Sequence, residues 1–296
     1  SFGYNGSERF AKNNQMGFFP AGGLAWVVTS EPFMASTSRW LEFLKFRASY
    51  GQVGNDGIVS SPRFVYLPTI ISMMGYKDPE SGTGSGQLVA RKVLSYANEK
   101  IKWEIAEQVN FGIEAKLFKG ILEFTLDGYQ EIRHNIIGYR TNVPANTGIE
   151  YSQLDNIGKS RSRGISGKIQ HAFNPDFWII LNGTFTYNKV VYKAFEEASD
   201  KPEWQRKVGK EISQQIGYIA EGVFQDQAEI DNSPTQSGDV MPGDIRYRDI
   251  NGDGMINVND ATFIGYPETP RIIYGFHGFI NYKNFEFSFA FQGSGN

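Results

Sequence analysis

Strict alternation of apolar and polar residues is the feature that most restricts the fold of this sequence. Between residues 285 and 291 every second residue is phenylalanine, and glutamate, serine and alanine stand between them. The segment VNFGIEAKL at 109–117 has the same period of two. Successive side chains of a β-strand point to opposite faces, whereas on a helix these phenylalanines would be spread around the axis. The sequence therefore predicts strands that each have one apolar face and one polar face.

About nine strands of this kind are predicted, and most of them form hairpins. Residues with turn propensity join the two strands of three hairpins, at 119–120, 174–176 and 283–284. The segments between hairpins are long, and they span residues 55–104, 138–161 and 192–270. A compact soluble sandwich has mostly short connections, whereas a transmembrane barrel has short turns at one rim and long loops at the other. The alternating loop lengths therefore favour a transmembrane β-barrel.

The composition of the chain argues against several classes of function. The chain has 29 Lys and Arg against 32 Asp and Glu, so no basic field is available to attract nucleic acid. The chain has no cysteine, which excludes disulfides and thiol chemistry. No apolar run approaches the roughly 20 residues of a membrane-spanning helix. Its three histidines, His134, His171 and His277, are far apart and lack the HExxH spacing. We therefore expect neither a nucleic-acid partner nor an enzyme.

The polar face of the predicted strands carries charge. Its charged residues include Lys45, Arg47, Glu114, Lys116, Glu123 and Asp127. In a barrel the apolar face contacts lipid and these charges line a wet interior, so that no charge is buried in hydrocarbon. In a soluble β-sandwich the apolar face would instead form the core, and the alternation alone is compatible with both folds. Bacterial single-chain barrels have an even number of strands, so we expect strands outside this chain to complete a barrel.

Several longer segments follow one another in an order that is typical of one family. They are GYNGSERFAKNNQMGFFPAGGLAW at 3–26, LKFRASYGQVGN at 44–55, WEIAEQVNFGIEAKLF at 103–118, RSRGISG at 161–167, GDIRYRDINGDGMINVND at 243–260, YPETPRIIYGF at 266–276 and YKNFEFSFAFQGSGN at 282–296. Together they resemble the SusC/RagA family of TonB-dependent outer membrane transporters, and the resemblance extends over nearly the whole chain.

This resemblance implies an all-β fold of antiparallel strands that form part of a transmembrane β-barrel of about 22 strands with long extracellular loops. Residues 1–296 would be a partial barrel domain without its plug and terminal strands, and residues 192–270 would be a long extracellular loop. The implied activity is import of an oligosaccharide or peptide across the outer membrane of a bacterial cell. The implied partners are TonB, through a segment outside this chain, a SusD-like surface lipoprotein and membrane lipid.

The segment DINGDGMINVND at 249–260 has the register of a twelve-residue calcium loop. Gly254 would permit the sharp bend, and Asp260 stands where the standard loop has a longer glutamate, which would lower the affinity for Ca²⁺. The oxygen ligands would come from Asp249, Asn251, Asp253, Met255 (through its carbonyl), Asn257 and Asp260. A metal-free turn rich in Asn, Gly and Asp would explain the same residues.

The same segment also resembles one half of a dockerin. It therefore supports an alternative function, a soluble all-β carbohydrate-associated binding or scaffold module with a calcium loop. Dockerins carry two copies of the loop, whereas this sequence has one. A requirement for detergent would separate the membrane protein from the soluble module.

Aromatic residues in the long connections are candidates for ligand contact. An aromatic ring offers apolar area to the face of a sugar and often a hydrogen bond as well. Packing within the loops, or contact with the lipoprotein partner, would explain the same residues. The candidates are Tyr66, Tyr76, Tyr151, Phe195 and Trp204.

Overall fold

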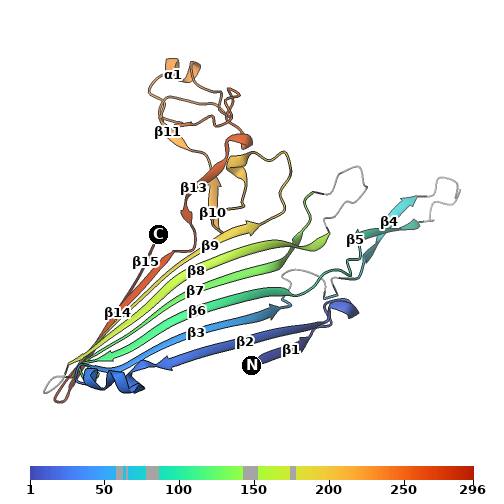
Figure 1. Ribbon diagram of the computed structural model, residues 1–296. Helices are drawn as coiled ribbons and strands as arrows, with labels where there is room; N and C mark the ends of the chain where they lie inside the picture. The colour runs from blue at the N-terminus through green and yellow to red at the C-terminus, as the bar shows by residue number, and fades with distance from the viewer. Residues whose placement is uncertain (58–62, 65, 78–86, 143–152, 174–177) are drawn as a thin grey trace.

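The computed structural model describes residues 1–57, 63–64, 66–77, 87–142, 153–173 and 178–296. Among these residues, nine strands form one antiparallel sheet in the order β1-β2-β3-β6-β7-β8-β9-β14-β15 (Figure 1). The strands are β1 (Phe2–Gly6), β2 (Met16–Val27), β3 (Leu41–Asn55), β6 (Glu104–Leu117), β7 (Leu122–Tyr139), β8 (Leu154–Phe173), β9 (Trp178–Ala194), β14 (Ile272–Tyr282) and β15 (Phe285–Gly295). Neighbours in the sheet follow one another in the chain, which is the connectivity of an up-and-down barrel wall.

The strand pairing confirms the predicted hairpins. β6 pairs with β7, β8 with β9, and β14 with β15. Apart from β1, the strands of this sheet contain 11 to 20 residues, and a tilted strand needs only about 9 to 11 residues to cross a bilayer. The strands are therefore long enough for the predicted barrel wall.

Two strands extend further than the alternation predicts, so the expected loop at 138–161 is too long. β7 continues to Tyr139 and β8 already begins at Leu154. Their pairing is irregular between Arg133 and Ile136, where Asn135 has a φ of 57°. A second shift, between Ile136 and Ile137, restores the register, so this bulge does not explain the missed part of β8. That part was not predicted because residues 158–164 contain no apolar side chain and therefore show no alternation. The short strand β1 was also not predicted.

The long connections carry small elements of their own, and they gather at one end of the sheet while the short turns lie at the other (Figure 1). The small strands pair as β4 (Thr69–Lys77) with β5 (Gln87–Ser95), β10 (Gln214–Gly217) with β13 (Thr262–Pro267), and β11 (Ala220–Val223) with β12 (Ile245–Tyr247). The helical turns are α1 (Gln227–Asp231), η1 (Lys12–Asn14), η2 (Val28–Ser30), η3 (Pro32–Thr37), η5 (Glu203–Gln205) and η6 (Val258–Asp260). In the part of the chain that the structure describes, none of the helices has the length and apolar character needed to cross a membrane.

The two faces of the large sheet differ as the alternation predicts. Ion pairs cross the strands on the polar face, where Arg47 lies 2.7 Å from Asp127 and 3.0 Å from Glu114. Large apolar side chains on the other face stay exposed, with Leu24 82% and Phe291 69% exposed. A soluble β-sandwich would bury such a face beneath a second large sheet, whereas the other sheets of the described residues are two-stranded ribbons. The fold is therefore a single two-faced sheet.

The buried core is small and lies where the long connections meet the sheet. Phe10, from the connection between β1 and β2, and Phe19 of β2 pack against Trp103, with ring centroids 5.4 and 5.3 Å apart. Ile101 completes this cluster, and partly buried residues at the ends of β7 and β8 pack against it. The cluster holds these strand ends in place beside the recess described next.

Candidate functional site

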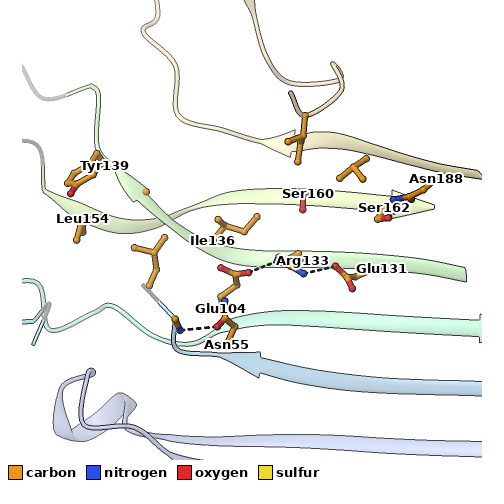
Figure 2. Close-up of a pocket in the computed structure, with 15 residues that line it drawn as sticks. Asn55, Glu104, Glu131, Arg133, Ile136, Tyr139, Leu154, Ser160, Ser162 and Asn188 are labelled. Atoms are coloured by element: carbon orange, nitrogen blue, oxygen red, sulfur yellow. Dashed lines mark hydrogen bonds and ion pairs between the residues drawn. The ribbon is translucent and has the colours of Figure 1, made fainter. Parts of the chain in front are cut away.

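A recess opens on the polar face at the end of the sheet where the long connections begin (Figure 2). Its volume is about 600 Å³, which lies within the range of pockets that bind small molecules. Most of its lining comes from β6, β7, β8 and β9. The polar side chains of the lining include Glu104, Glu131, Arg133, Ser160, Ser162 and Asn188.

Arg133 lies between two carboxylates of the recess, as Figure 2 shows. Its Nη1 is 3.3 Å from Oε1 of Glu104, and its Nη2 donates a 3.0 Å hydrogen bond to Oε1 of Glu131. The second oxygen of Glu131 accepts a 2.8 Å hydrogen bond from the side chain of Gln108. One guanidinium stands between two carboxylates, so these three side chains give the recess fixed polar groups with an excess of one negative charge.

Two serines and an asparagine form the opposite wall of the recess. Ser162 Oγ donates a 2.7 Å hydrogen bond to Oδ1 of Asn188. Ser160 is only 7% exposed. Among the described residues, neither the Ser160 hydroxyl nor the Asn188 amide nitrogen has a protein partner. Neither group is among the buried side-chain atoms without a partner, so both are open to solvent in the recess.

The bulge in β7 shapes this end of the recess. β7 gains one residue relative to β8 between Arg133 and Ile136, and β8 gains one in turn between Ile136 and Ile137, which restores the register. Asn135 takes the left-handed conformation that asparagine tolerates. The carbonyl of Asn135 accepts a 2.6 Å hydrogen bond from Nδ2 of Asn156, which also donates to the carbonyl of Lys102 at 2.9 Å. One side chain of β8 thereby ties β7 to the segment that leads into β6.

Sequence reasoning did not identify this recess. Ser160 lay in a segment that was expected to be a loop, so no face could be assigned to it. A signal was present for the other wall, because the alternation in DGYQEIRH at 127–134 places Glu131 and Arg133 on the same face as Asp127. The alternation predicts which residues share a face of the sheet, but it does not predict that they line a recess.

The predicted calcium loop lies in the connection between β9 and β14. The carboxylate of Asp249 accepts hydrogen bonds from the amides of Gly252 and Gly254 at 2.7 and 2.8 Å. Asp260 is fully buried and accepts hydrogen bonds from backbone amides, including that of Asn257 at 2.9 Å. Burial raises the pKa of Asp260, but these amide donors outweigh burial and hold the pKa below its ordinary value.

The other predicted ligands also bind the backbone of the loop. Asp253 accepts from the amide of Met255 at 2.8 Å, and Asn251 accepts from the amide of Asp253 at 3.0 Å. Asn257 Oδ1 accepts from the amide of Asn259 at 2.8 Å. Within the described ranges, no three His, Asp or Glu side chains converge on a point that could hold a metal ion. In this conformation the segment is a series of Asx turns, and calcium binding stays a prediction.

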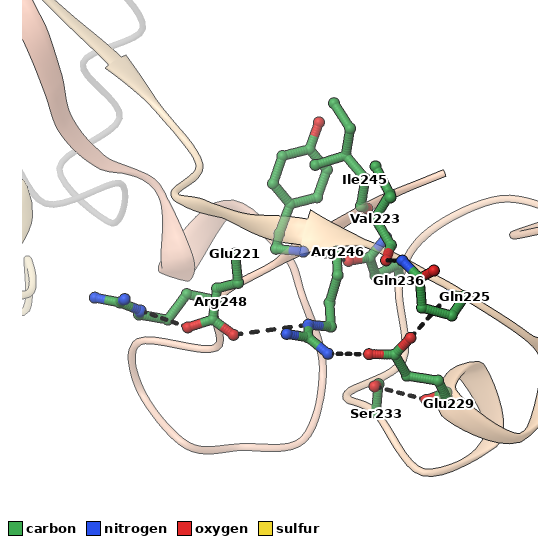
Figure 3. A network of polar contacts seen from close by, with 10 residues as sticks. Glu221, Val223, Gln225, Glu229, Ser233, Gln236, Ile245, Arg246 and Arg248 are labelled. Carbon is green, nitrogen blue, oxygen red and sulfur yellow. Dashed lines mark hydrogen bonds and ion pairs between the residues drawn. The ribbon is translucent and has the colours of Figure 1, made fainter. Parts of the chain in front are cut away.

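Ion pairs hold together the part of the connection that precedes this loop (Figure 3). Arg246 lies between Glu229, to which its Nη1 donates, and Glu221, which is 3.9 Å from its Nε. Arg248 donates a 2.8 Å hydrogen bond to the same Glu221. These contacts join β11, β12 and α1 into one small unit.

A second ion-pair cluster attaches the connection to the large sheet. Glu211 is 8% exposed, accepts a 2.8 Å hydrogen bond from Nε of Arg271 at the start of β14, and lies 3.3 Å from Nζ of Lys189 on β9. Burial raises the pKa of Glu211, but hydrogen bonds from Arg271 and Lys189 outweigh burial, so the pKa lies below its ordinary value. The cluster joins two neighbouring strands through a residue of the connection.

The candidate aromatic residues lie away from the recess lining where the structure describes them. Phe195 packs against Tyr192 with centroids 5.5 Å apart, and Trp204 donates a 2.8 Å hydrogen bond to the carbonyl of Asn259. The ring of Tyr66 lies edge-on to Phe64, with centroids 6.3 Å apart. Tyr76 belongs to β4, and Tyr151 lies outside the described residues. Their contact with a ligand stays a prediction.

Comparison with known proteins identifies the family. The family model for the β-barrel of TonB-dependent receptor-like proteins matches residues 1–291. The chain belongs to this family. TonB-dependent receptor P3 of Formosa agariphila is 31% identical over 305 residues, which cover 98% of this chain and 29% of that protein. TonB-dependent receptor SusC of Bacteroides thetaiotaomicron is 26% identical over 306 residues, which cover 99% of this chain and 29% of that protein.

A solved structure has the same fold as this TonB-dependent receptor barrel. The RagAB peptide importer in its closed-closed state superposes with a TM-score of 0.74 at 18% identity, over 99% of this chain and 31% of that chain. The chain thus spans about 29% of the length of the curated relatives it matches. The nine-stranded sheet is therefore part of a larger barrel.

These findings confirm the resemblance to the SusC/RagA family and the predicted fold class. Members of the family are receptors and transporters, and TonB-dependent receptor β-barrels are outer membrane proteins. Membership in this family favours the barrel over the soluble dockerin-like module.

Proposed function

We propose that the complete protein imports an oligosaccharide or peptide nutrient across the bacterial outer membrane. Energy would be supplied through TonB, and a SusD-like surface lipoprotein would be the partner. The observation that carries this proposal is membership in the TonB-dependent receptor family by a chain whose sheet has one exposed apolar face and one charged face. The first face suits lipid and the second suits an aqueous passage.

The relatives support both ligand classes. One curated relative is named SusC, and a structural neighbour is described as a peptide importer. The genes beside the full-length gene offer an independent indication. Neighbouring glycoside hydrolases would support a glycan, and neighbouring peptidases would support a peptide.

Fractionation and uptake measurements test the transport proposal. Full-length protein is expected in the outer membrane fraction, and deletion of its gene is expected to abolish uptake of one labelled nutrient. A protonophore should block the same uptake, because TonB energy derives from the inner membrane. Recovery of the protein in the buffer-soluble fraction would contradict the proposal and favour the soluble module.

The partner is tested separately. Full-length protein purified in detergent from outer membranes is expected to retain a lipid-modified surface protein encoded beside its own gene. Purification of the transporter alone, in a detergent that keeps the barrel folded, would remove the lipoprotein from the proposal.

A further inference from the structure

We propose that a cluster of basic side chains on the apolar face of β8 and β9 binds the phosphate group of an anionic lipid in the outer leaflet of the outer membrane. The cluster consists of Arg161, Arg163 and Lys189, and we call it the basic cluster. The inference rests on the proposed function only for the membrane in which the barrel lies. It goes beyond that function, because it names a lipid partner and a site outside the aqueous passage.

The strand register places the basic cluster on the face that otherwise carries apolar residues. On β8, Arg163 and Arg161 occupy the alternate positions that precede Ile165, and on β9, Lys189 occupies the alternate position that follows Tyr187. Ile165 is opposite Tyr187, and Arg163 is opposite Lys189. Residues two apart on a strand share a face, and so do residues directly opposite on neighbouring strands. All three cations therefore lie on the apolar face.

The basic cluster lies at the edge of the apolar band, on the side of the long connections. On β8 the apolar residues of this face stand at 165, 169 and 173, whereas Arg161 and Arg163 lie nearer the start of the strand, at the end of the sheet where the long connections gather (Figure 1). With these connections outside the cell, as in the proposed function, this edge lies at the headgroups of the outer leaflet. A charge on the lipid-facing side costs much less near the interface than at the midplane.

Positive charge exceeds negative charge in the surroundings of the basic cluster. Arg163 and Lys189 are directly opposite each other, and like charges at opposite positions destabilise a pair of strands. Glu211 lies 3.3 Å from Nζ of Lys189, but it also accepts a 2.8 Å hydrogen bond from Nε of Arg271. With Arg161, four cations stand against the one carboxylate of Glu211. A further anion would therefore stabilise this arrangement.

The two arginines of the basic cluster have unused donors. Nε of Arg163 donates to Oε1 of Gln130, and its Nη groups have no partner among the described residues. Arg161 forms no ion pair or side-chain hydrogen bond in the part of the chain that the structure describes. Glu107 of β6 shares the row of opposite residues that contains Arg161, but Ile132 lies between them. A phosphate can accept from two nitrogens of one guanidinium at once, so it supplies the acceptors that the cluster lacks.

The neighbouring side chains favour a lipid over a soluble anion. Ile169 on β8 and Phe185 on β9 continue the same face below the basic cluster and are 51% and 44% exposed. The acyl chains of a lipid would cover these apolar side chains while its phosphate reaches the cations. A free phosphate ion would make the polar contacts only. We therefore assign the basic cluster to a lipid headgroup.

The test uses full-length protein purified in detergent, with monophosphoryl lipid A as the probe and the same lipid without its phosphate as the reference. The unaltered protein is expected to bind the phosphorylated lipid more tightly, and added salt should weaken this binding. Arg163→Gln should weaken it about tenfold or more, because charge-assisted hydrogen bonds are lost. Arg161→Gln should weaken it in the same way.

Lys168→Gln is the matched control for these variants. Lys168 is exposed on the same strand. It lies two positions from Ser166, which is opposite Asp127, so it shares the polar face with Asp127. The control removes one positive charge from β8, as Arg163→Gln does, but from the face that does not contact lipid. It should leave the affinity for the lipid unchanged.

Three results would overturn the inference. They are equal affinity for the lipid with and without phosphate, equal affinity of the Arg163→Gln and Lys168→Gln proteins for the phosphorylated lipid, and displacement of the lipid by millimolar inorganic phosphate, which would assign the cluster to a soluble anion. A folded barrel migrates faster on gels than the same barrel after heating, and this heat-modifiable migration shows whether each variant is folded. If Arg163→Gln is not folded, Arg161→Gln decides the question.

Measurements in cells separate this inference from the proposed function. Energy-dependent uptake by a protein that does not distinguish the two lipids would refute the lipid site and leave the importer intact. Selective binding of the phosphorylated lipid by a protein that supports no uptake would refute the importer and leave the lipid site intact.

Discussion

At the scale of single residues, glycines let neighbouring chains and rings approach closely on the polar face. A Cβ at Gly164 of β8 would lie 2.5 Å from the carbonyl oxygen of Tyr187 and would also meet the ring of Tyr129. A Cβ at Gly128, on the adjacent strand, would meet nothing within 4 Å. Gly164→Ala is therefore expected to lower stability by about 1–3 kcal/mol, and Gly128→Ala to change it little. The stability of each variant is measured as the temperature at which the full-length barrel loses its fast migration on gels. Equal temperatures for Gly164→Ala and Gly128→Ala would contradict the close packing at Gly164.

Glu211 supplies a prediction about pH. Its pKa is lower in the folded chain than in the unfolded chain, so its contacts stabilise the fold above about pH 4.3, the ordinary pKa of glutamate. That contribution is lost as the pH falls through the folded pKa. The protection of residues 195–271 against hydrogen exchange, measured relative to the intrinsic exchange rate at each pH, is therefore expected to fall on acidification.

A matched pair of variants makes this prediction specific. Glu211→Gln should reproduce the loss of protection at neutral pH, because it removes the charge that Arg271 and Lys189 bind. Glu203→Gln is the control, since Glu203 is exposed in the same connection and forms no ion pair within the described residues. Identical exchange in the two variants would show that the Glu211 cluster does not hold this connection to the sheet.

At the scale of elements, β15 tests the assignment of the two faces. Phe287 is 59% exposed on the apolar face, and Ser288 is exposed on the opposite face. An arginine on the lipid face costs about 2–4 kcal/mol at the bilayer midplane, whereas a wet interior accepts charge. Phe287→Arg is therefore expected to impair assembly of the full-length barrel more than Ser288→Arg. Equal amounts of heat-modifiable protein from the two variants would contradict the assignment of the two faces.

The loop at 249–260 is the second element with a measurable prediction. Calorimetric titration of purified full-length protein with Ca²⁺ is expected to release heat, and a chelator should abolish the signal. Asp249→Asn and Asp253→Asn should weaken the binding, because each removes a negative oxygen ligand. Absence of heat at millimolar Ca²⁺ would leave the Asx turns as the full explanation of this segment.

At the scale of the whole molecule, the sheet depends on strands beyond those described. β1 and β15 each pair on one side only, and unpaired edges together with an exposed apolar face favour aggregation. Residues 1–296 expressed alone are therefore expected to form no heat-modifiable barrel, whereas the full-length protein should form one. A stable, monodisperse preparation of residues 1–296 in buffer without detergent would contradict this view of the sheet.

Individual residues show which features of the fold could be predicted from the sequence. The alternation placed Arg47, Glu114 and Asp127 on one face, and the ion pairs between them confirm it. The same reasoning missed the first part of β8, because residues 158–164 contain no apolar side chain and therefore show no alternation. The place of Ser160 in the recess could not be predicted, since it depends on the register of β8 with β7 and β9.

The sequence by itself determined most strands of the large sheet, their two faces and the family, because alternation and ordered motifs are properties of neighbouring residues along the chain. Only the tertiary structure decided that residues from four strands enclose a polar recess and that Glu211 joins β9 to β14. Those features arise from strand register and from contacts between residues far apart in the chain, which local patterns do not specify.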